Sequence, residues 1–152
     1  QILIGVPYAL LDMVDFNQFQ LNNTIIMETG GMKGKRKEMV RTELHEKLKR
    51  GFGVSKIHSE YGMTELLSQA YSKGDGIFKT PSWMKVIIRD INDAQNVDFN
   101  KKSGAINIID LANYNSCSFI ATDDMGKHVN DDEFELIGRV DNSDIRGCNL
   151  LV

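Results

Sequence analysis

The first half of the chain carries an apolar pattern that predicts a strand, a loop, a helix and a second strand. Residues 23–28 have the apolar content of a short strand, and residues 29–34 contain three glycines, which indicates a loop. In residues 35–50, apolar side chains recur at every fourth position from Val40, as in an amphipathic helix, and two glycines follow as the expected helix end. Residues 54–60 then form the second strand. Such a βαβ unit places its two strands parallel in one sheet.

The second half of the chain has a different pattern, in which short apolar runs are separated by polar turn residues. It shows no helical stripe, and it predicts an antiparallel sheet or a distorted barrel. The predicted fold class is therefore α/β, with a βαβ-containing portion of a mostly parallel sheet followed by a β-rich, antiparallel or barrel-like subdomain. The predicted domains are residues 1–75, the α/β portion, and residues 76–152, the β-rich part with a hinge-like tail. The predicted strands of the second half are residues 83–90, 104–111, 118–122 and 134–140.

The composition argues against several classes of protein. Apolar residues make up 41% of the chain and charged residues 26%, which is typical of a soluble globular protein. No apolar run approaches the length of about 20 residues that a membrane-spanning helix needs, and the N-terminus lacks the basic leader of a signal peptide. The net charge of −3 and the lack of interleaved aromatic residues in the basic segment 33–50 argue against nucleic-acid binding. Two cysteines with neither metal-ligand spacing nor a disulfide framework indicate a cytoplasmic location.

The stretch HSEYGMTE, residues 58–65, places a Tyr-Gly pair and a Thr-Glu pair where the second predicted strand stops. Gly62 allows a sharp turn that leaves the Thr64 hydroxyl and the Glu65 carboxylate at the edge of the sheet, where ligands of α/β proteins bind. A hydroxyl can donate to a phosphoryl oxygen, and a carboxylate is a hard oxygen ligand. The stretch therefore predicts a site for a phosphate and its magnesium ion. The alternative is an ordinary turn between a strand and a helix, with the threonine as the helix cap.

Four motifs occur in a fixed order along the chain, namely TGGMKG at residues 29–34, YGMTE at 61–65, TDD at 122–124 and GRVD at 138–141. Taken singly, each has a structural alternative, such as a tight turn, a polar turn or a charge on an edge strand. Taken in this order, they resemble the motifs of the adenylate-forming superfamily, which comprises acyl-CoA synthetases, adenylation domains of peptide synthetases and luciferases. In that superfamily the corresponding motifs line one nucleotide site.

The resemblance implies which residues bind ATP. Gly30 and Gly31 would let the backbone approach the purine closely, and Tyr61 would pack on the adenine ring. Asp124 would accept hydrogen bonds from both ribose hydroxyls, a task that suits the two oxygens of a carboxylate. Arg139 would lie over the ribose or the phosphates.

The resemblance also implies the catalytic groups of an acid-thiol ligase. Gly62 belongs to the same nucleotide-binding motif as Thr64, which would bind phosphate oxygens. Glu65 would hold Mg²⁺, which neutralises the charge that develops at the α-phosphorus. Asp141 matches the position at which related enzymes hinge between their two half-reactions. The implied cofactors are ATP and Mg²⁺.

Within the superfamily, the segments 27–39 and 138–152 look like those of the acyl-protein synthetases, the fatty-acid-activating subunits of the bacterial bioluminescence reductase. This likeness implies that a fatty acid is activated as an acyl-adenylate and then passes to a cysteine of the enzyme as a thioester. Cys148 fits that acceptor, since a thiolate is a strong nucleophile and the cation of Arg146 favours the thiolate. An acyl-CoA reductase-like protein is the implied partner.

Two alternatives stay open. In an acyl-CoA or aryl-CoA ligase, coenzyme A rather than Cys148 would be the thiol. In a non-catalytic nucleotide-binding module, the site would keep its shape without chemistry.

The chain also departs from the superfamily pattern. Asp123 occupies the glycine position of the T-G-D motif, and neither a Ser/Thr/Gly-rich phosphate loop nor the lysine-bearing lid domain is found in the sequence. The likeness covers only the C-terminal part of such an enzyme, and the chain starts with Gln1 rather than Met. We therefore expect the phosphate loop to precede Gln1, and the chain by itself to be inactive.

The remaining cysteine and the histidines receive less specific predictions. Cys117 is predicted to lie in a strand and in the core. His58, next to the Tyr-Gly turn, is predicted to be structural, with contact to the acyl substrate or to magnesium-bound water as the alternative. The sequence assigns no role to His45 or His128.

Overall fold

The computed structural model describes residues 1–37, 39–97 and 102–140 of the chain. These residues divide into two compact units. The first contains residues 1–60 and 72–76, and the second contains residues 61–71 and 77–140 of those described. Their strands belong to a mixed sheet, which is parallel in the first unit and antiparallel in the second. The prediction of an α/β fold is confirmed, whereas the sheet is mixed rather than mostly parallel.

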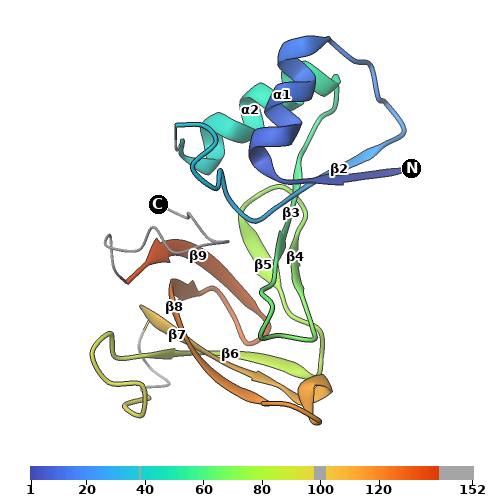
Figure 1. The fold of residues 1–152 in the computed structure, drawn as a ribbon. Coiled ribbons are helices and arrows are strands. Elements are labelled where there is room, and N and C mark those ends of the chain that lie inside the picture. The colour runs from blue at the N-terminus through green and yellow to red at the C-terminus, as the bar shows by residue number, and fades with distance from the viewer. Residues whose placement is uncertain (38, 98–101, 141–152) are drawn as a thin grey trace. The chain divides into compact units, whose positions relative to one another are not determined.

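The first unit is a parallel sheet with two helices packed on one face. Its elements are β1 (Ile2–Gly5), α1 (Pro7–Phe16), β2 (Ile25–Thr29), α2 (Arg41–Phe52) and β3 (His58–Tyr61). β1 pairs with β2 and β2 pairs with β3, and both pairs are parallel, as the βαβ pattern predicted. Figure 1 shows the two helices together on one side of β1 and β2. Because alternate residues of a strand point to opposite faces, Leu3 and Ile26 pack in the core under the helices, whereas Ile2 and Ile25 are exposed.

Local chemistry explains where the helices begin and end. α1 begins with Pro7, whose fixed φ suits the first position of a helix. α2 ends at Gly53, which has the left-handed φ of 68° found at helix C-caps. Inside α2, Gly51 permits a close approach to α1, because a Cβ there would lie 2.4 Å from the Cβ of Val14. The prediction that both glycines end the helix is therefore wrong for Gly51.

The helix and the second strand of the first unit both begin later than the sequence predicted. α2 starts at Arg41 rather than at residue 35, and β3 starts at His58 rather than at residue 54. In the loop before α2, Arg36 forms ion pairs with Asp12 and Asp15 of α1. The apolar pattern alone does not give the helix start, because tertiary contacts such as these compete with local propensity.

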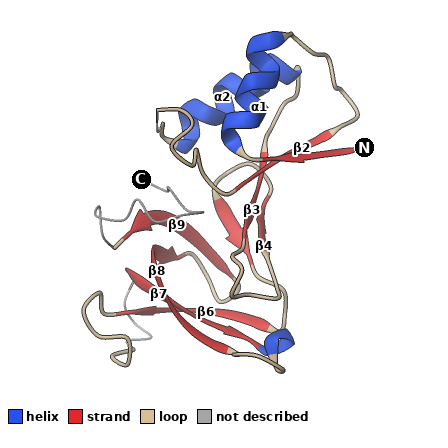
Figure 2. Cartoon of the chain, in the orientation of Figure 1, coloured by secondary structure: helices blue, strands red, loops and turns tan. Residues whose placement is uncertain are grey.

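The second unit is an open antiparallel sheet. Its elements are β5 (Ile77–Lys79), β6 (Met84–Arg89), β7 (Ser103–Asp110), the short helix η1 (Leu111–Asn113), β8 (Phe119–His128) and β9 (Glu133–Arg139), while β4 (Ala70–Ser72) lies where the chain passes from this unit to the first. The strands pair antiparallel in the order β5-β9-β8-β7-β6, and Figure 2 shows them as arrows. Since β5 and β6 stand at opposite ends of this order, these strands form an antiparallel sheet, as predicted, and the barrel-like alternative is wrong.

Aromatic rings form the centre of the core in the second unit. The rings of Phe78 and Phe134 stack with centroids 5.6 Å apart, and the ring of Tyr61 meets Phe134 edge to face at 5.4 Å. Isoleucines from β6 and β7, such as Ile88 and Ile106, complete this core. The tyrosine of the YGMTE motif is thus a core residue of this unit.

In the second half, one prediction and one structural alternative are wrong. β8 extends from Phe119 to His128, beyond the predicted residues 118–122, and includes the TDD motif, so the alternative of a polar turn at Asp123 and Asp124 is wrong. Cys117 is exposed rather than in the core. It lies before β8, which begins at Phe119, and so it is not in a strand. Among the helices that the structure describes, none has the length and apolar character required to span a bilayer.

Candidate functional site

The side chains of Tyr61, Asp124 and Arg139 meet in the second unit. Asp124 on β8 is paired with Arg139 on β9 in the antiparallel register. The hydroxyl of Tyr61 donates to Oδ2 of Asp124 at 2.7 Å, and Nε of Arg139 lies 3.8 Å from Oδ1. Nη2 of Arg139 also lies 3.4 Å from Oδ2 of Asp123. The structure therefore brings together three of the residues that the sequence analysis assigned to nucleotide binding, in what we name the Tyr61–Asp124–Arg139 cluster.

Burial disfavours charge in this cluster. Only 7% of Asp124 is exposed. Burial raises the pKa of Asp124, although the hydrogen bond from Tyr61 and the charge of Arg139 act in the opposite direction. Burial, and then the negative charge of Asp124, raise the pKa of Tyr61 well above its usual value, so that its hydroxyl stays a donor. A buried carboxylate with a raised pKa beside a charged side chain is a candidate for a functional site.

Thr64 and Glu65 lie on an exposed turn directly after β3. The turn is tied to the rest of the second unit through its backbone, since Nδ2 of Asn113 donates to the carbonyl oxygen of Glu65 at 2.7 Å. The side chains of Thr64 and Glu65 are exposed, as a role in binding phosphate or a metal ion requires. The predicted helix cap at Thr64 has no helix to follow it, because the chain continues through an irregular segment to β4.

The irregular segment after Glu65 is held by Asp110 at the end of β7. Oδ2 of Asp110 accepts from the backbone N–H groups of Leu67 and Ser68 at 3.0 and 2.8 Å, and Oδ1 accepts from the Ser68 hydroxyl at 2.7 Å. The hydroxyl of Ser68 in turn accepts from Nε1 of Trp83 at 2.9 Å. The N–H of Ala112 also donates to Oδ1 of Asp110 at 3.1 Å. The sequence analysis missed Asp110, although an aspartate that ends an apolar strand is a recognisable signal of a side chain that binds backbone N–H groups.

Gly30 and Gly31 lie in the first unit, in the loop that follows β2. Gly30 has a φ of 75° and Lys33 a φ of 52°, so the loop uses left-handed backbone that favours glycine. At the start of the loop, the hydroxyl of Thr29 donates to Oε1 of Glu60 on β3 at 2.9 Å. This contact connects the carboxyl ends of two parallel strands, where ligands of α/β sheets bind.

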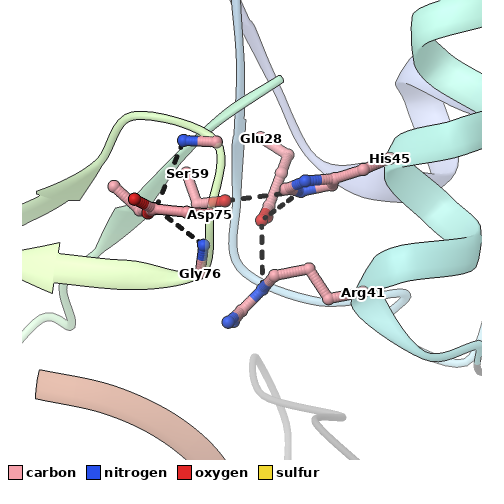
Figure 3. Close-up of polar contacts among 8 residues, drawn as sticks. Glu28, Arg41, His45, Ser59, Asp75 and Gly76 are labelled. Atoms are coloured by element: carbon pink, nitrogen blue, oxygen red, sulfur yellow. Dashed lines mark hydrogen bonds and ion pairs between the residues drawn. The ribbon is translucent and has the colours of Figure 1, made fainter. Parts of the chain in front are cut away.

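A second polar cluster of the first unit contains His45, to which the sequence analysis assigned no role. Figure 3 shows Arg41 and His45 reaching from α2 toward Glu28 on β2. Nε2 of His45 lies 3.4 Å from Oε1 of Glu28 and 3.4 Å from Oγ of Ser59, and Nε of Arg41 lies 3.8 Å from the same oxygen of Glu28. Glu28, His45 and Ser59 are buried. The sequence placed His45 on a charged helix face, and only the approach of β2 and β3 makes it a core residue.

The geometry of this cluster argues against nucleophilic catalysis by Ser59. In a Ser-His-acid triad, the two nitrogens of the imidazole contact different partners, so that one accepts the serine proton while the other is held by the acid. Here Nε2 of His45 contacts both Ser59 and Glu28. The cluster therefore serves to hold the carboxyl ends of β2 and β3 against α2 and to satisfy a buried carboxylate.

The described residues offer few ligands for a magnesium ion. Across residues 1–37, 39–97 and 102–140, no group of three or more His, Cys, Asp or Glu side chains is placed to enclose a metal ion. Mg²⁺ in nucleotide sites keeps several waters and binds through one or two carboxylates together with substrate phosphates. A single exposed carboxylate, that of Glu65, fits such a site, and it does not fit a metal held by protein groups alone.

Some of the predicted residues lie outside those that the structure describes, namely Asp141, Arg146 and Cys148. His58 lies on β3, and its Nδ1 is buried with no hydrogen-bond partner among the described residues. His128 lies at the end of β8, away from the TDD motif in the strand, and burial lowers its pKa.

The structure is similar to several ligases of known structure. Coronafacic acid ligase from Pectobacterium brasiliense has 20% sequence identity and a TM-score of 0.61, over 91% of this chain and 29% of that chain. ATP-bound MatB from Rhodopseudomonas palustris has 15% identity and a TM-score of 0.62, over 91% of this chain and 31% of that chain. The anthranilate CoA ligase AuaEII in complex with anthranoyl-AMP has 16% identity and a TM-score of 0.62, over 93% of this chain and 30% of that chain. No protein-family model and no curated protein sequence matches the chain.

At these identities the likeness concerns the fold. The chain spans about 30% of the length of the ligases that it resembles. Its order of elements, from a parallel sheet with helices to an antiparallel sheet, is thus that of one portion of such an enzyme. The chain therefore has the fold of this portion of those ligases.

Proposed function

We propose that the protein containing this chain activates a carboxylic acid with ATP and transfers the acyl group to a thiol. The observation that supports this most is the fold shared with CoA ligases, one of which was solved with an acyl-adenylate, anthranoyl-AMP. The Tyr61–Asp124–Arg139 cluster adds support, since it gathers three motif residues around one buried carboxylate.

The proposed reaction has two steps. A carboxylate is a poor electrophile, so an oxygen of the acid first attacks the α-phosphorus of ATP. The bond to the β-phosphate breaks, and pyrophosphate leaves. A thiolate then attacks the acyl carbon of the adenylate, the bond to AMP breaks, and a thioester forms.

Residues of the second unit have separate roles in this reaction. Thr64 binds phosphate oxygens from the exposed turn, and Glu65 holds Mg²⁺, which when bound offsets the charge that develops at the α-phosphorus. Asp124 and Arg139 bind the ribose and the phosphates, and Tyr61 orients Asp124 through its hydroxyl.

We propose coenzyme A as the first candidate for the thiol, because the neighbours named as CoA ligases use this fold. Acyl or aryl acids are the corresponding substrate class. The second candidate is Cys148, which would make the protein a fatty acid:protein ligase with a reductase-like partner. This second candidate rests only on the resemblance that the sequence analysis drew for residues 27–39 and 138–152.

ATP–pyrophosphate exchange tests the first step. The full-length protein is assayed with a panel of fatty and aromatic acids, beside Glu65→Ala and a matched control, Glu43→Ala, which removes an exposed carboxylate on α2. We expect acid-dependent exchange in the wild type and the control, and a loss of about a hundredfold in Glu65→Ala. No exchange with any acid would contradict the proposed activity, and equal exchange in all three proteins would contradict the role of Glu65.

The acceptor thiol is identified by following the acyl group. We expect acyl-CoA to form, by mass spectrometry, in Cys148→Ser as in the wild type if coenzyme A is the acceptor. A hydroxylamine-labile adduct that is lost in Cys148→Ser and kept in Cys117→Ser would instead establish the second candidate. Cys117 is a suitable control because it is an exposed cysteine.

A further inference from the structure

We propose that Asp110 is a positioning residue that fixes the Thr64–Glu65 turn for the binding of phosphate and Mg²⁺. This inference rests on the proposed function for its consequence in catalysis. Its structural half, that the carboxylate of Asp110 orders the segment after Glu65, can be tested without any activity.

The contacts of Asp110 are directed at one segment. Its side chain is fully buried, and both oxygens are used. The N–H groups of Leu67 and Ser68 and the hydroxyl of Ser68 all donate to it from the segment that directly follows Glu65. A carboxylate that accepts several short hydrogen bonds from one stretch of backbone fixes the path of that stretch.

Asn113, three positions after Asp110, holds the turn itself. Its Nδ2 donates to the carbonyl oxygen of Glu65 at 2.7 Å and to that of Cys117 at 2.9 Å. Asp110 is the N-cap of η1, Asn113 is its last residue, and Ala112 within η1 donates its N–H to Asp110. The end of β7 and η1 therefore form one scaffold, which holds the exposed turn from its buried side.

The exposed side of the turn is left to solvent. Thr64 and Glu65 are exposed, whereas Leu66 and Ser68 are buried. Residues with exposed functional groups on a turn keep a defined geometry only if the backbone beneath them is fixed, and a misplacement of about 1 Å can cost two orders of magnitude in rate. The anchored backbone is thus what a site at Thr64 and Glu65 requires.

The charge of Asp110 suits this role. Burial opposes ionisation, yet the hydrogen bonds from the Ser68 side chain and from the backbone of Ser68, Leu67 and Ala112 outweigh it and lower the pKa of Asp110. The carboxylate is therefore ionised at neutral pH and accepts all of these bonds. Asparagine has the same size but keeps only one acceptor oxygen and no charge.

Hydrogen exchange tests the structural half. Amide protection is measured in the full-length protein for the wild type, for Asp110→Asn and for Ile106→Val, a conservative cavity variant of the same strand. We expect the amides of Leu67 and Ser68 to lose about tenfold or more of their protection in Asp110→Asn, with the loss confined to the segment after Glu65. In Ile106→Val, any loss of protection should fall on the amides of β7, and the amides of Leu67 and Ser68 should keep theirs. Unchanged protection of Leu67 and Ser68 in Asp110→Asn would overturn the proposal.

The dependence of pyrophosphate exchange on Mg²⁺ tests the functional half. We expect Asp110→Asn to need about tenfold more Mg²⁺ for half-maximal exchange, with little change in the KM for the acid, because the displaced Glu65 holds the ion less well. Ile106→Val should keep the wild-type requirement. An unchanged Mg²⁺ requirement in a folded Asp110→Asn overturns the positioning role, whereas absent exchange in the wild type overturns the proposed function instead.

A second variant keeps the test decisive if Asp110→Asn does not fold. Asn113→Asp is isosteric but replaces the donor to Glu65 and Cys117 by an acceptor. We expect a smaller shift in the same direction, that is, an increased Mg²⁺ requirement at an unchanged KM for the acid. A fall in kcat alone, with no shift in the Mg²⁺ requirement, would contradict the proposed scaffold.

Discussion

Asp110 and Asp124 are both buried carboxylates of the second unit, and their environments move their pKa values in opposite directions. Asp110 accepts three backbone N–H groups and one hydroxyl. Asp124 accepts the Tyr61 hydroxyl, and the nearest nitrogen of Arg139 lies 3.8 Å away. Burial is common to both, so the number and strength of the donors decide whether the charged form is favoured.

The comparison separates a structural anchor from a candidate binding group. The donors of Asp110 are supplied by the fold and need no ligand. Asp124 has fewer donors and its pKa is raised, so further donors to its carboxylate would favour the charged form. A buried carboxylate that gains hydrogen-bond donors from a ligand can contribute to the binding of that ligand.

The largest expected effect is on stability and concerns Asp110. Asp110→Asn leaves buried N–H donors without the carboxylate that they face, and we expect the free energy of unfolding to fall by about 3 kcal/mol at neutral pH. Because the folded-state pKa of Asp110 is lowered, its contribution is present above the unfolded pKa of about 4 and is lost as the pH falls through the folded-state value. The difference between wild type and variant, measured by urea unfolding, should therefore shrink in acid. A constant difference from pH 7 down to strongly acidic pH would contradict this role of the charge.

An intermediate effect is expected at Tyr61. Tyr61→Phe keeps the ring that contacts Phe78 and Phe134 edge to face but removes the donor 2.7 Å from Asp124. A buried acceptor that loses its partner costs about 1–2 kcal/mol, and the pKa of Asp124 should rise further because this bond favours its charged form. Chemical denaturation at neutral pH gives the cost. A variant as stable as the wild type would show that solvent replaces the hydroxyl.

The smallest effect on stability is expected at Asp124 itself. Asp124→Asn keeps an acceptor for Tyr61 and removes a charge that burial disfavours, so the free energy of unfolding should stay within about 1 kcal/mol of the wild-type value. Because the folded-state pKa of Asp124 is raised, the wild type bears its penalty at neutral pH and is relieved of it as the pH falls through that value. Any advantage of the variant should thus vanish in acid. If the proposed function is correct, pyrophosphate exchange falls although stability does not, and a strongly destabilised variant would end the contrast with Asp110.

The local pattern was sufficient to predict some of this molecule. The glycine loop after β2, the parallel pair of β2 and β3, and the antiparallel strands of the second half follow from apolar periodicity and turn residues. These features depend on contacts between near neighbours, such as the alternation of faces along a strand or the left-handed glycine at residue 53. The order of its motifs also pointed to a fold like that of the ligases to which the structure is similar.

Tertiary structure alone decided the rest. Whether Cys117 is buried, whether His45 is a core residue and whether TDD lies in a strand all depend on which distant elements approach them. The same is true of the two carboxylates, since an isolated aspartate has no donors to distinguish it. Asp110 and Asp124 are alike in the sequence, and only the backbone and side chains brought to each by folding lower the pKa of one and leave the pKa of the other raised.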